Sequence, residues 1–394
     1  MSLFAQRGQG CAGRAAYIAV LLIVLLVAGC GPTLDRPAPA TFAPATWAPS
    51  ATVALPAPPP PATATPLPPA VPTSAIAPPT PVPAPATMPP TAPPLAPRRV
   101  ADWPVVPAID AAMQARLRRV LGVGIKLGNR PAVFAKAGDS ITAASAFLQD
   151  FACPGPRRGT DAGRGADAAL AETIRYFGAA QFPLDAKKAG CGSANSFSRT
   201  SVSAVPGWSS ANALAPPRKP PPGCLPPYDA ALICELHLIQ PGIVLIMYGT
   251  NDLGKSDDVD GFAGRLSVLV QQALALGVIP VLSTIPPRFD DIEYIKRVPL
   301  FNAAIVRVAA EQQVPLWNYW LALQAPGLPN HGIGEDGIHP SIYGCPACDP
   351  TNLTPVGLRY GYNLRNLAAL QVLAKLQRVV IDAGLPDPSV GIDS

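Results

Sequence analysis

Three short polar clusters carry the residue types that acyl transfer requires. They are Gly138–Ser140 (Gly-Asp-Ser), Gly249–Asp252 (Gly-Thr-Asn-Asp) and Asp336–His339 (Asp-Gly-Ile-His). Together they supply a hydroxyl nucleophile, a side-chain amide, and a carboxylate close to an imidazole. Acyl transfer needs a nucleophile, a base and donors for a developing oxyanion, so these clusters together form one candidate site.

The first and third clusters provide a nucleophile and a base. The hydroxyl of Ser140 is a poor nucleophile until a base removes its proton, and a histidine such as His339 is the natural base, because imidazole as a side chain ordinarily changes charge near neutral pH. Asp336 precedes His339 by three residues, with Gly337 between them. A tight turn can bring that carboxylate onto the ring and hold the imidazole in one tautomer. The spacing therefore predicts a triad of Ser140, His339 and Asp336.

The same clusters offer two donors to an oxyanion. We expect them to be the backbone N–H of Ser140 and the side-chain amide of Asn251, and each such donor typically lowers the barrier by roughly 3 kcal/mol.

Each of these residues also has a purely structural interpretation. Ser140 could cap a helix that begins at Ile141, because serine is a favoured cap. Asn251 could be a turn residue, since Asn-Asp pairs favour turns, and we interpret Asp252 as structural.

The base and its orienting acid have competitors. His237 lies in a segment that we expect to be helical, 233–240, and we interpret it as structural. His331 lies in a loop where it could contact substrate. Glu335 and Asp349 compete with Asp336, but neither has the three-residue spacing to the base.

The elements that position the clusters alternate between strand-like and helix-like patterns. Apolar, β-rich segments predict strands, and segments with helical spacing lie between them. This order predicts an α/β fold with a parallel sheet covered by helices on both faces, whose site forms at the carboxyl ends of the strands. The predicted strands are 131–138, 242–249, 278–287 and 314–320, and the predicted helices are 166–177, 262–277, 300–313 and 361–384.

The three clusters, in this order, resemble the conserved blocks of the SGNH hydrolases, also called GDSL-type lipases and esterases. The likeness spans most of 131–340, although Ile141 stands where the name motif has leucine. The resemblance implies a flavodoxin-like three-layer α/β/α sandwich and hydrolysis of esters. It implies neither a cofactor nor a metal.

The resemblance also implies a glycine whose backbone N–H joins the oxyanion hole. Gly207 follows a β-like segment and precedes a helix-like one, within 201–214. Gly192 is the alternative, but it lies in a cysteine-rich loop. We expect Gly207, together with Ser140 and Asn251, to form the hole. The long separation of Gly207 from the first cluster leaves the shape of the substrate pocket open.

The first 97 residues predict export and a spacer. Residues 1–29 have a basic start and an uninterrupted apolar stretch, 15–27, which is typical of a signal peptide. The ending Leu26–Cys30 resembles a bacterial lipobox, which implies that Cys30 carries lipid; an ordinary secretory signal is the alternative. Residues 30–97 are rich in Pro, Ala and Thr and predict an extended spacer. The hydrolase-like domain is expected at 98–394.

Outside the leader the cysteines are even in number, which favours disulfides in an exported protein. The expected local pairs are Cys224–Cys234 and Cys345–Cys348, which leaves Cys153 and Cys191 as the third pair. Sequence proximity is the only basis for this pairing. A zinc site would need a second close cysteine pair, and a redox role for Cys345 and Cys348 would need a thioredoxin-like context.

The charge and the aromatic residues indicate which partners to expect. The net charge of +5 is modest, and the cluster of Arg116, Arg118 and Arg119 lacks interleaved aromatic residues, so a solvated helix face is favoured over nucleic-acid binding. Four aromatic residues could form a platform for a sugar, although such residues more often belong to a core: Trp208, Tyr248, Trp317 and Trp320.

The sequence as a whole predicts an exported esterase that is anchored to the outer face of a membrane through Cys30. The favoured substrate is a carboxylic ester such as a carbohydrate O-acetyl ester. Lipase or thioesterase-type acyl hydrolysis is one alternative, and a catalytically idle cell-surface binding module is another.

Overall fold

The computed structural model describes residues 99–152, 165–182, 194–224 and 229–384. Within these ranges a parallel sheet of four strands has the order β1-β2-β3-β4. The strands are β1 (Arg130–Gly138), β2 (Pro241–Met247), β3 (Ile279–Ser283) and β4 (Leu316–Trp317). Every residue of β2 and β3 is buried, as expected for strands that helices cover on both faces.

A short stretch around Ala204 extends this sheet. Ala204 pairs in parallel with Gly138, and Gly138 also pairs with Met247 of β2, so the stretch lies on the free side of β1. In chain order the five segments then follow the pattern 2-1-3-4-5, which is that of flavodoxin-like folds. The predicted fold class is confirmed.

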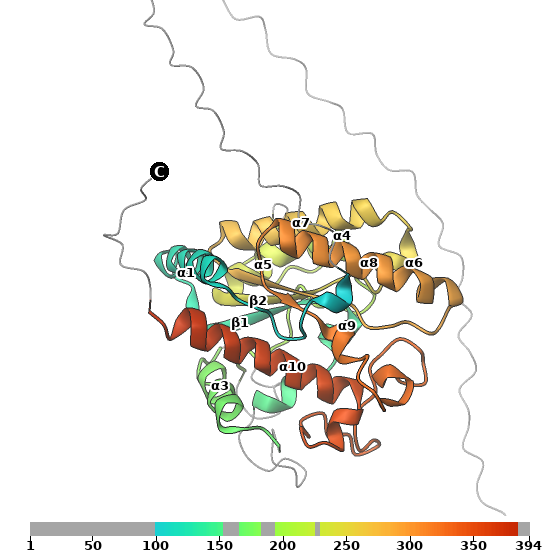
Figure 1. Ribbon diagram of the computed structural model, residues 1–394. Coiled ribbons are helices and arrows are strands. Elements are labelled where there is room, and N and C mark those ends of the chain that lie inside the picture. Colours follow the sequence, from blue (N-terminus) through green and yellow to red (C-terminus); the bar gives the residue numbers. More distant parts are fainter. Residues whose placement is uncertain (1–98, 153–164, 183–193, 225–228, 385–394) are drawn as a thin grey trace, which may run out of the picture. The chain divides into compact units, whose positions relative to one another are not determined.

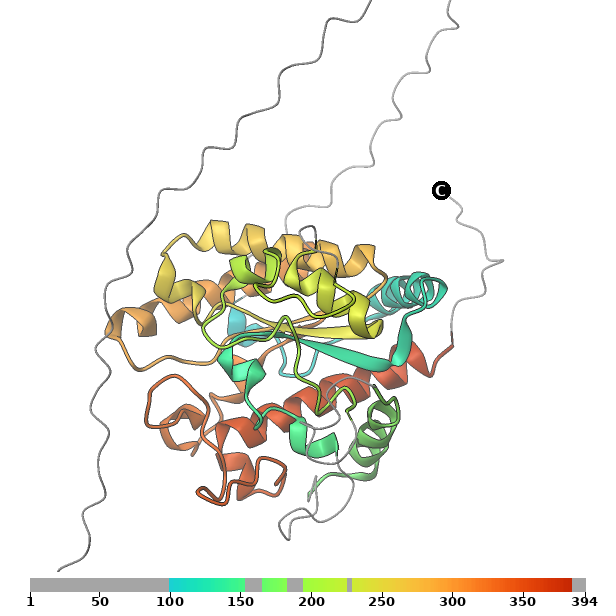
Figure 2. The same cartoon turned by 180° about the vertical axis from the view of Figure 1, so that it is seen from behind.

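Helices cover both faces of the sheet (Figures 1 and 2). One face carries α4 (Ser210–Leu214), α5 (Ala231–Ile239), α7 (Val259–Ala275) and α8 (Ile292–Glu311). The other face carries α3 (Ala168–Gly178) and α10 (Gly361–Leu376).

Three further helices have only four residues each and lie next to the strand ends. They are α2 (Ser140–Ala143), α6 (Asp252–Lys255) and α9 (Tyr319–Ala322). The remaining long helix, α1 (Ala111–Lys126), precedes β1, and a π-helical turn (Gln377–Ile381) follows α10. No helix among the described residues is both long and apolar enough to cross a membrane.

Aspartate caps fix where several helices begin. The side chains of Asp110, Asp167, Asp258 and Asp291 accept backbone N–H groups in the first turns of α1, α3, α7 and α8. Such caps satisfy donors that have no partner within the helix. The cap at Asp291 explains why α8 starts at Ile292, earlier than the predicted 300–313, and passes through Pro299.

The prediction of a strand over 314–320 was wrong in its second half. The observed strand ends at Trp317, because Asn318 caps α9 by accepting the N–H of Leu321. A second difference lies at the C-terminal helix, where the π-helical turn replaces the last part of the single helix predicted over 361–384.

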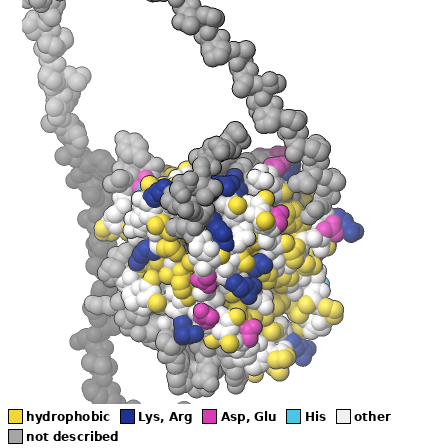
Figure 3. Space-filling model, turned by 60° about the vertical axis from the view of Figure 1, so that its left-hand side comes forward, with side chains coloured by type: hydrophobic (Ala, Val, Ile, Leu, Met, Phe, Trp, Pro, Cys, Tyr) yellow, Lys and Arg dark blue, Asp and Glu magenta, His cyan; other side chains and the backbone are white. Residues whose placement is uncertain are grey.

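The basic cluster on α1 is partly used to cap neighbouring helices. Arg116 donates to the carbonyl of Gln312 (3.2 Å) and Arg118 to that of Val379 (3.4 Å). The face of the molecule seen in Figure 3 intersperses basic side chains with acidic and apolar ones. Arg116 and Arg118 are half-buried against these helices, whereas Arg119 is exposed.

Candidate active site

The first cluster lies where β1 ends and α2 begins. Gly138 is required there, because a Cβ would overlap the hydroxyl of Thr142 and the carbonyl of Met247. Asp139 caps α2: its Oδ1 accepts the N–H of Ile141 at 2.9 Å. The alternative in which Ser140 is the cap is therefore wrong. Ser140 is the first residue of α2 and is half-buried.

The third cluster meets the first through His339. Its Nε2 lies 2.8 Å from the Oγ of Ser140, and its Nδ1 lies 2.6 Å from Oδ2 of Asp336. With the proton on Nδ1 donated to Asp336, Nε2 is free to accept the proton of Ser140. The structure thus joins the three predicted residues in one chain of hydrogen bonds.

A tight turn brings Asp336 onto the ring. Oδ1 of Asp336 accepts the backbone N–H groups of Ile338 (3.0 Å) and His339 (2.9 Å), and Gly337 adopts φ +70°. Burial alone would raise the pKa of Asp336. The hydrogen bonds from Ile338 and from the ring and N–H of His339 outweigh it and lower that pKa below its ordinary value.

The competing residues are placed elsewhere. Asp349 accepts the N–H and the hydroxyl of Thr351, and Glu335 is exposed. His237, on α5, lies 3.7 Å from Asp229. His331 is exposed and its Nδ1 lies 3.2 Å from the carbonyl of Leu323.

The other two expected oxyanion residues, Gly207 and Asn251, lie in neighbouring loops. The side-chain amide of Asn251 donates to the carbonyl of Trp208 at 2.9 Å, and Trp208 follows Gly207 directly. An amide nitrogen carries two hydrogens, so the second hydrogen of Asn251 remains for another acceptor. Gly207 has φ +78° with open space where a Cβ would lie. Gly192 lies outside the described residues.

Pairing with β1 sets the path of the chain into Gly207. Gly138 donates its N–H to Ser203 (2.9 Å) and accepts that of Val205 (3.1 Å). The hydroxyl of Tyr248 also donates to the carbonyl of Ser203. The stretch that leads to Gly207 is therefore fixed to the residue two positions before Ser140.

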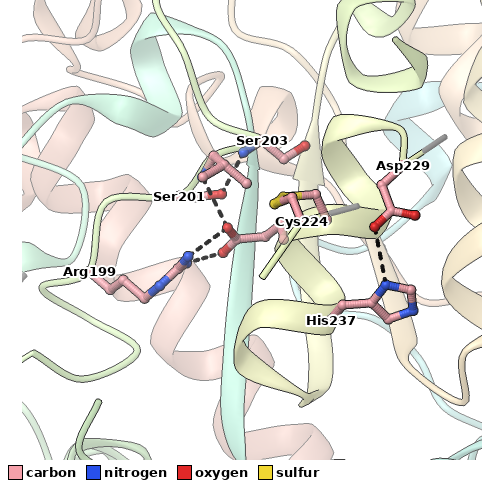
Figure 4. Close-up of a disulfide and its surroundings, with 9 residues drawn as sticks. Arg199, Ser201, Ser203, Cys224, Asp229 and His237 are labelled. Carbon is pink, nitrogen blue, oxygen red and sulfur yellow. Dashed lines mark hydrogen bonds and ion pairs between the residues drawn. A yellow bond between two sulfur atoms is a disulfide. The ribbon is translucent and has the colours of Figure 1, made fainter. Parts of the chain in front are cut away.

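A buried ion pair anchors the same stretch, next to a disulfide (Figure 4). The guanidinium of Arg199 pairs in a bidentate manner with Glu235, whose side chain is 0% exposed. Glu235 follows Cys234, which forms a disulfide with Cys224. The other disulfide among the described residues, Cys345–Cys348, follows the histidine turn. Both are the expected local pairs, whereas Cys153 and Cys191 lie outside the described residues.

Asp252 connects helices. Its carboxylate accepts the N–H (2.9 Å) and hydroxyl (2.5 Å) of Ser210, and lies 3.5 Å from Arg265 on α7. This agrees with the structural interpretation of Asp252.

Two buried arginines near the clusters were not foreseen. Arg288 donates to the carbonyl of Thr250 at 2.7 Å and pairs with Asp290. The neighbouring residue Phe289 donates its N–H to Gly337 at 2.8 Å. The 288–290 loop thus connects the asparagine loop to the histidine turn.

The second unforeseen arginine is Arg365 on α10. It donates to the carbonyl of Ile141 (2.7 Å) and to the hydroxyl of Thr142 (3.2 Å), immediately after Ser140. A charged residue on the apolar face of a helix was the available signal, since Ala369 and Val372, one and two turns later, are fully buried.

Asp139, next to the nucleophile, is fully buried. Burial raises its pKa from 3.8 to about 6, against the opposing effects of the Ile141 N–H, the charge of Arg365, the hydroxyl of Thr250 and the charge of His339.

A shallow pocket of about 180 Å³ adjoins the 288–290 loop. It is lined in part by Arg288, Phe289, Trp320, Gln324 and His331. Two of the four aromatic residues considered for a sugar platform, Tyr248 and Trp317, are instead buried in the core. No group of His, Cys, Asp and Glu side chains in the described ranges is suited to hold a metal ion.

The sequence matches the model of the GDSL-like lipase/acylhydrolase family over residues 137–345. Similar solved structures include a GDSL-like lipase from Bacteroides thetaiotaomicron, with 16% identity, 66% of this chain and 98% of that chain covered, and a TM-score of 0.38. An acetyl esterase mutant with acetate has 16% identity, coverage of 62% and 98%, and a TM-score of 0.38. An acetyl-xylooligosaccharide esterase from a Geobacillus species has 15% identity, coverage of 61% and 93%, and a TM-score of 0.35.

No curated protein matches the chain. The family match spans more than half of the sequence and contains all three polar clusters. The chain therefore belongs to the GDSL-like lipase/acylhydrolase family and is a hydrolase of the SGNH type.

Proposed function

We propose that this protein is an extracytoplasmic serine esterase that hydrolyses carboxylic esters through Ser140, His339 and Asp336. The observation that carries the proposal is the continuous chain of contacts from the Ser140 hydroxyl through both ring nitrogens of His339 to the Asp336 carboxylate. This arrangement is ready to remove the serine proton without a preceding rearrangement.

The reaction then proceeds in two halves. The Oγ of Ser140 attacks the ester carbonyl while Nε2 of His339 takes its proton, and Asp336 stabilises the resulting imidazolium. The tetrahedral intermediate expels the alcohol, which receives the proton from His339 and leaves an acyl-serine. Water, deprotonated by His339, attacks this acyl group and releases the carboxylic acid, and the proton returns to Ser140.

The oxyanion formed in each half accepts hydrogen bonds from the N–H groups of Ser140 and Gly207 and from the amide of Asn251. The free second hydrogen of the Asn251 amide supports this assignment, as does the open space beside Gly207. These bonds strengthen as negative charge develops, so they lower the barrier rather than simply tightening ground-state binding.

The test combines turnover with labelling of the nucleophile. The protein should hydrolyse a chromogenic short-chain ester, and a fluorophosphonate adduct mapped by mass spectrometry should lie on Ser140. Ser140→Ala should lose both signals, whereas Ser256→Ala, at an exposed serine outside the clusters, should keep both. An adduct on another serine with activity intact would reject the assignment, and inactivity on every ester would favour the idle binding module.

For the substrate we propose an O-acetyl ester of a carbohydrate, with the sugar ring in the pocket beside the 288–290 loop. The support is continuity: Phe289, in the pocket wall, is hydrogen-bonded to Gly337 in the histidine turn. Trp320 supplies an aromatic face, and Gln324 and His331 supply polar groups, a combination that suits a ligand with one apolar and one polar side.

An ester panel tests the substrate separately from the triad. Trp320→Ala should raise KM for an acetylated pyranoside and leave ethyl acetate hydrolysis unchanged, because only the sugar reaches the pocket. An unchanged KM for the pyranoside would contradict this placement. Preference for long acyl chains or thioesters would favour the lipase or thioesterase alternative.

We further propose that Cys30 is lipidated after cleavage of 1–29 and that 30–97 forms the spacer between the membrane and the 98–394 domain. The lipobox-like position of Cys30 supports this proposal. Mass spectrometry of the mature N-terminus should find a lipid-modified Cys30 in the membrane fraction, and Cys30→Ser should release the protein. A soluble mature chain that begins elsewhere would contradict it.

A further inference from the structure

We propose that Arg365 is a positioning residue for the nucleophile: from α10 it holds the backbone of α2 so that Ser140 meets His339 at hydrogen-bond distance. The catalytic part of this inference rests on the proposed esterase function. The contacts themselves belong to the fold and can be tested without any ester.

The helix that begins at Ser140 is too short to be stable alone. α2 has four residues, and forming a first helical turn is unfavourable without support from packing. The carbonyls of a helix end need partners from outside. Within α2 and its cap the carbonyl of Asp139 is used by Thr142 and Ala143, and that of Ser140 by Ala144.

The carbonyl of Ile141 is the one that α10 takes. Nη1 of Arg365 donates to it at 2.7 Å, and the hydroxyl of Tyr362 donates at 3.3 Å. The N–H of Ile141 is held on the other side by Asp139. Both polar backbone groups of Ile141 are therefore fixed by side chains: the N–H by Asp139, two residues earlier, and the carbonyl by α10.

The second nitrogen of Arg365 extends this hold. Nη2 donates to the hydroxyl of Thr142 at 3.2 Å, and that hydroxyl lies only 2.3 Å from where a Cβ on Gly138 would be. The guanidinium therefore contacts two consecutive residues of α2, and the second of them packs against the end of β1. A lysine ammonium is a single point charge and cannot reproduce this fork.

The surroundings of Arg365 are unusual for a cation. Its side chain is 1% exposed, and its guanidinium carbon lies 3.8 Å from the ring centre of Phe147, with Trp317 at 5.4 Å and Tyr319 at 5.6 Å. None of the ion pairs in the described part of the chain includes it. Burying a cation is costly. Aromatic faces and the α2 acceptors compensate here, so the guanidinium has little freedom to move.

The consequence for catalysis is geometric. Ser140 and His339 belong to separate segments, and their 2.8 Å contact depends on how α2 sits on the sheet. Without the guanidinium the carbonyl of Ile141 loses its stronger donor, and the Oγ and N–H of Ser140 shift together. A misplacement of about 1 Å in a reacting group can cost about 100-fold in rate.

The experiment compares Arg365→Met and Arg365→Lys with a matched control, Gln377→Leu. Gln377 is also buried, in the π-helical turn after α10, and accepts the hydroxyl of Thr173 at 2.8 Å, so its replacement removes a buried hydrogen bond without contacting α2. The quantities to measure are kcat and KM on a chromogenic acetate ester, expressed per folded molecule. Near-ultraviolet circular dichroism gives the folded fraction, and thermal unfolding is followed for the same proteins.

A positioning role predicts a split between kcat and KM. Arg365→Met should lose about 100-fold in kcat with KM within about threefold, and Arg365→Lys should lose about 10-fold, because one of the two contacts can be rebuilt. Gln377→Leu should unfold at a lower temperature and keep kcat. If Arg365→Met does not fold, Arg365→Lys decides: wild-type kcat in that variant overturns the proposal.

Hydrogen exchange supplies a readout that does not depend on activity. The peptide over 138–146 should exchange faster in Arg365→Lys and Arg365→Met than in the wild type, and it should be unchanged in Gln377→Leu. Equal exchange in all four proteins would reject the hold on α2 whatever the kinetics. Inactive wild-type protein with faster exchange in the variants would instead reject the esterase function and leave the structural contact established.

Discussion

Replacing Asp336 by asparagine should harm turnover more than replacing it by alanine. The carboxylate has two tasks on two oxygens. Oδ1 accepts the N–H groups of Ile338 and His339, and Oδ2 lies 2.6 Å from Nδ1 of His339. An asparagine keeps an oxygen for the turn, so its NH₂ group must face Nδ1.

The NH₂ group reverses the tautomer of the ring. It can only donate to Nδ1, so the single proton of the neutral imidazole moves to Nε2, which lies 2.8 Å from Ser140 Oγ. The ring then has no lone pair with which to take the serine proton. Fixing the wrong tautomer in this way is expected to cost about 10⁴-fold in kcat.

The alanine variant should be less damaged. Asp336 has a side-chain exposure of 50%, so water can replace Oδ2 and accept from Nδ1 with the correct tautomer. We expect a smaller loss of kcat for Asp336→Ala than for Asp336→Asn, since turn geometry and imidazolium stabilisation are lost but the base keeps its productive tautomer. Steady-state kinetics on a chromogenic acetate ester, corrected for folded protein, measures both. Equal or greater activity in Asp336→Asn than in Asp336→Ala would refute this tautomer argument, and full activity in Asp336→Ala would show that the ring needs no orienting acid.

Three other changes test different parts of the site. Asn251→Ala should lower kcat by about 100-fold or more with little change in KM, because its donor acts mainly on the transition state; an unchanged kcat would remove Asn251 from the oxyanion hole. Arg288→Leu leaves the carbonyl of Thr250 and the side chain of Asp290 without this partner. We therefore expect kcat to fall by about 10-fold or more and the protein to unfold at a lower temperature. A lower unfolding temperature with unchanged kcat would show that Arg288 stabilises the fold but does not position the site. Asp139 has a pKa raised from 3.8 to about 6, so the folded state binds its proton more tightly and the free energy of unfolding falls as pH rises through that window, by on the order of 3 kcal/mol. Asp139→Asn keeps an acceptor for Ile141 but has no proton to lose, so its free energy of unfolding should not show this fall between about pH 4 and about pH 7 in denaturant unfolding. The same change in the free energy of unfolding for the wild type and the variant would contradict this expectation.

The sequence was sufficient where a function depends on neighbours along the chain. The pairing of Asp336 with His339 follows from their spacing and from Gly337, because one turn decides it. The strands of the sheet were likewise readable, since burial on both faces demands continuous apolar segments such as 242–247. Errors arose at element ends. Trp317 and Tyr319 have the same residue preference, and the strand stops between them only because Asn318 caps the next helix.

Contacts between distant segments were not predictable in the same way. Arg288 and Arg365 were not singled out from the sequence, although each contacts a residue beside the predicted site. The contacts that join them to these residues go to backbone carbonyls, and a carbonyl leaves no trace in residue identity. The hydrogen bond from the Ser210 hydroxyl to the Asp252 carboxylate joins α4 to α6, and its donor was equally hard to predict, because several nearby residues could have supplied the hydroxyl.

This difference separates the chemistry of the site from its rigidity. The groups that would react come from the end of β1 and from the Asp336–His339 turn, where residue type alone determines what they can do. The groups that fix their distances come from helix α10 and from the 288–290 loop, where the outcome depends on how far each side chain reaches. A change at Ser140 or His339 should therefore abolish a step, whereas a change at Arg365 or Arg288 should degrade a distance. Only the second class should be recoverable by a residue that restores the same contacts.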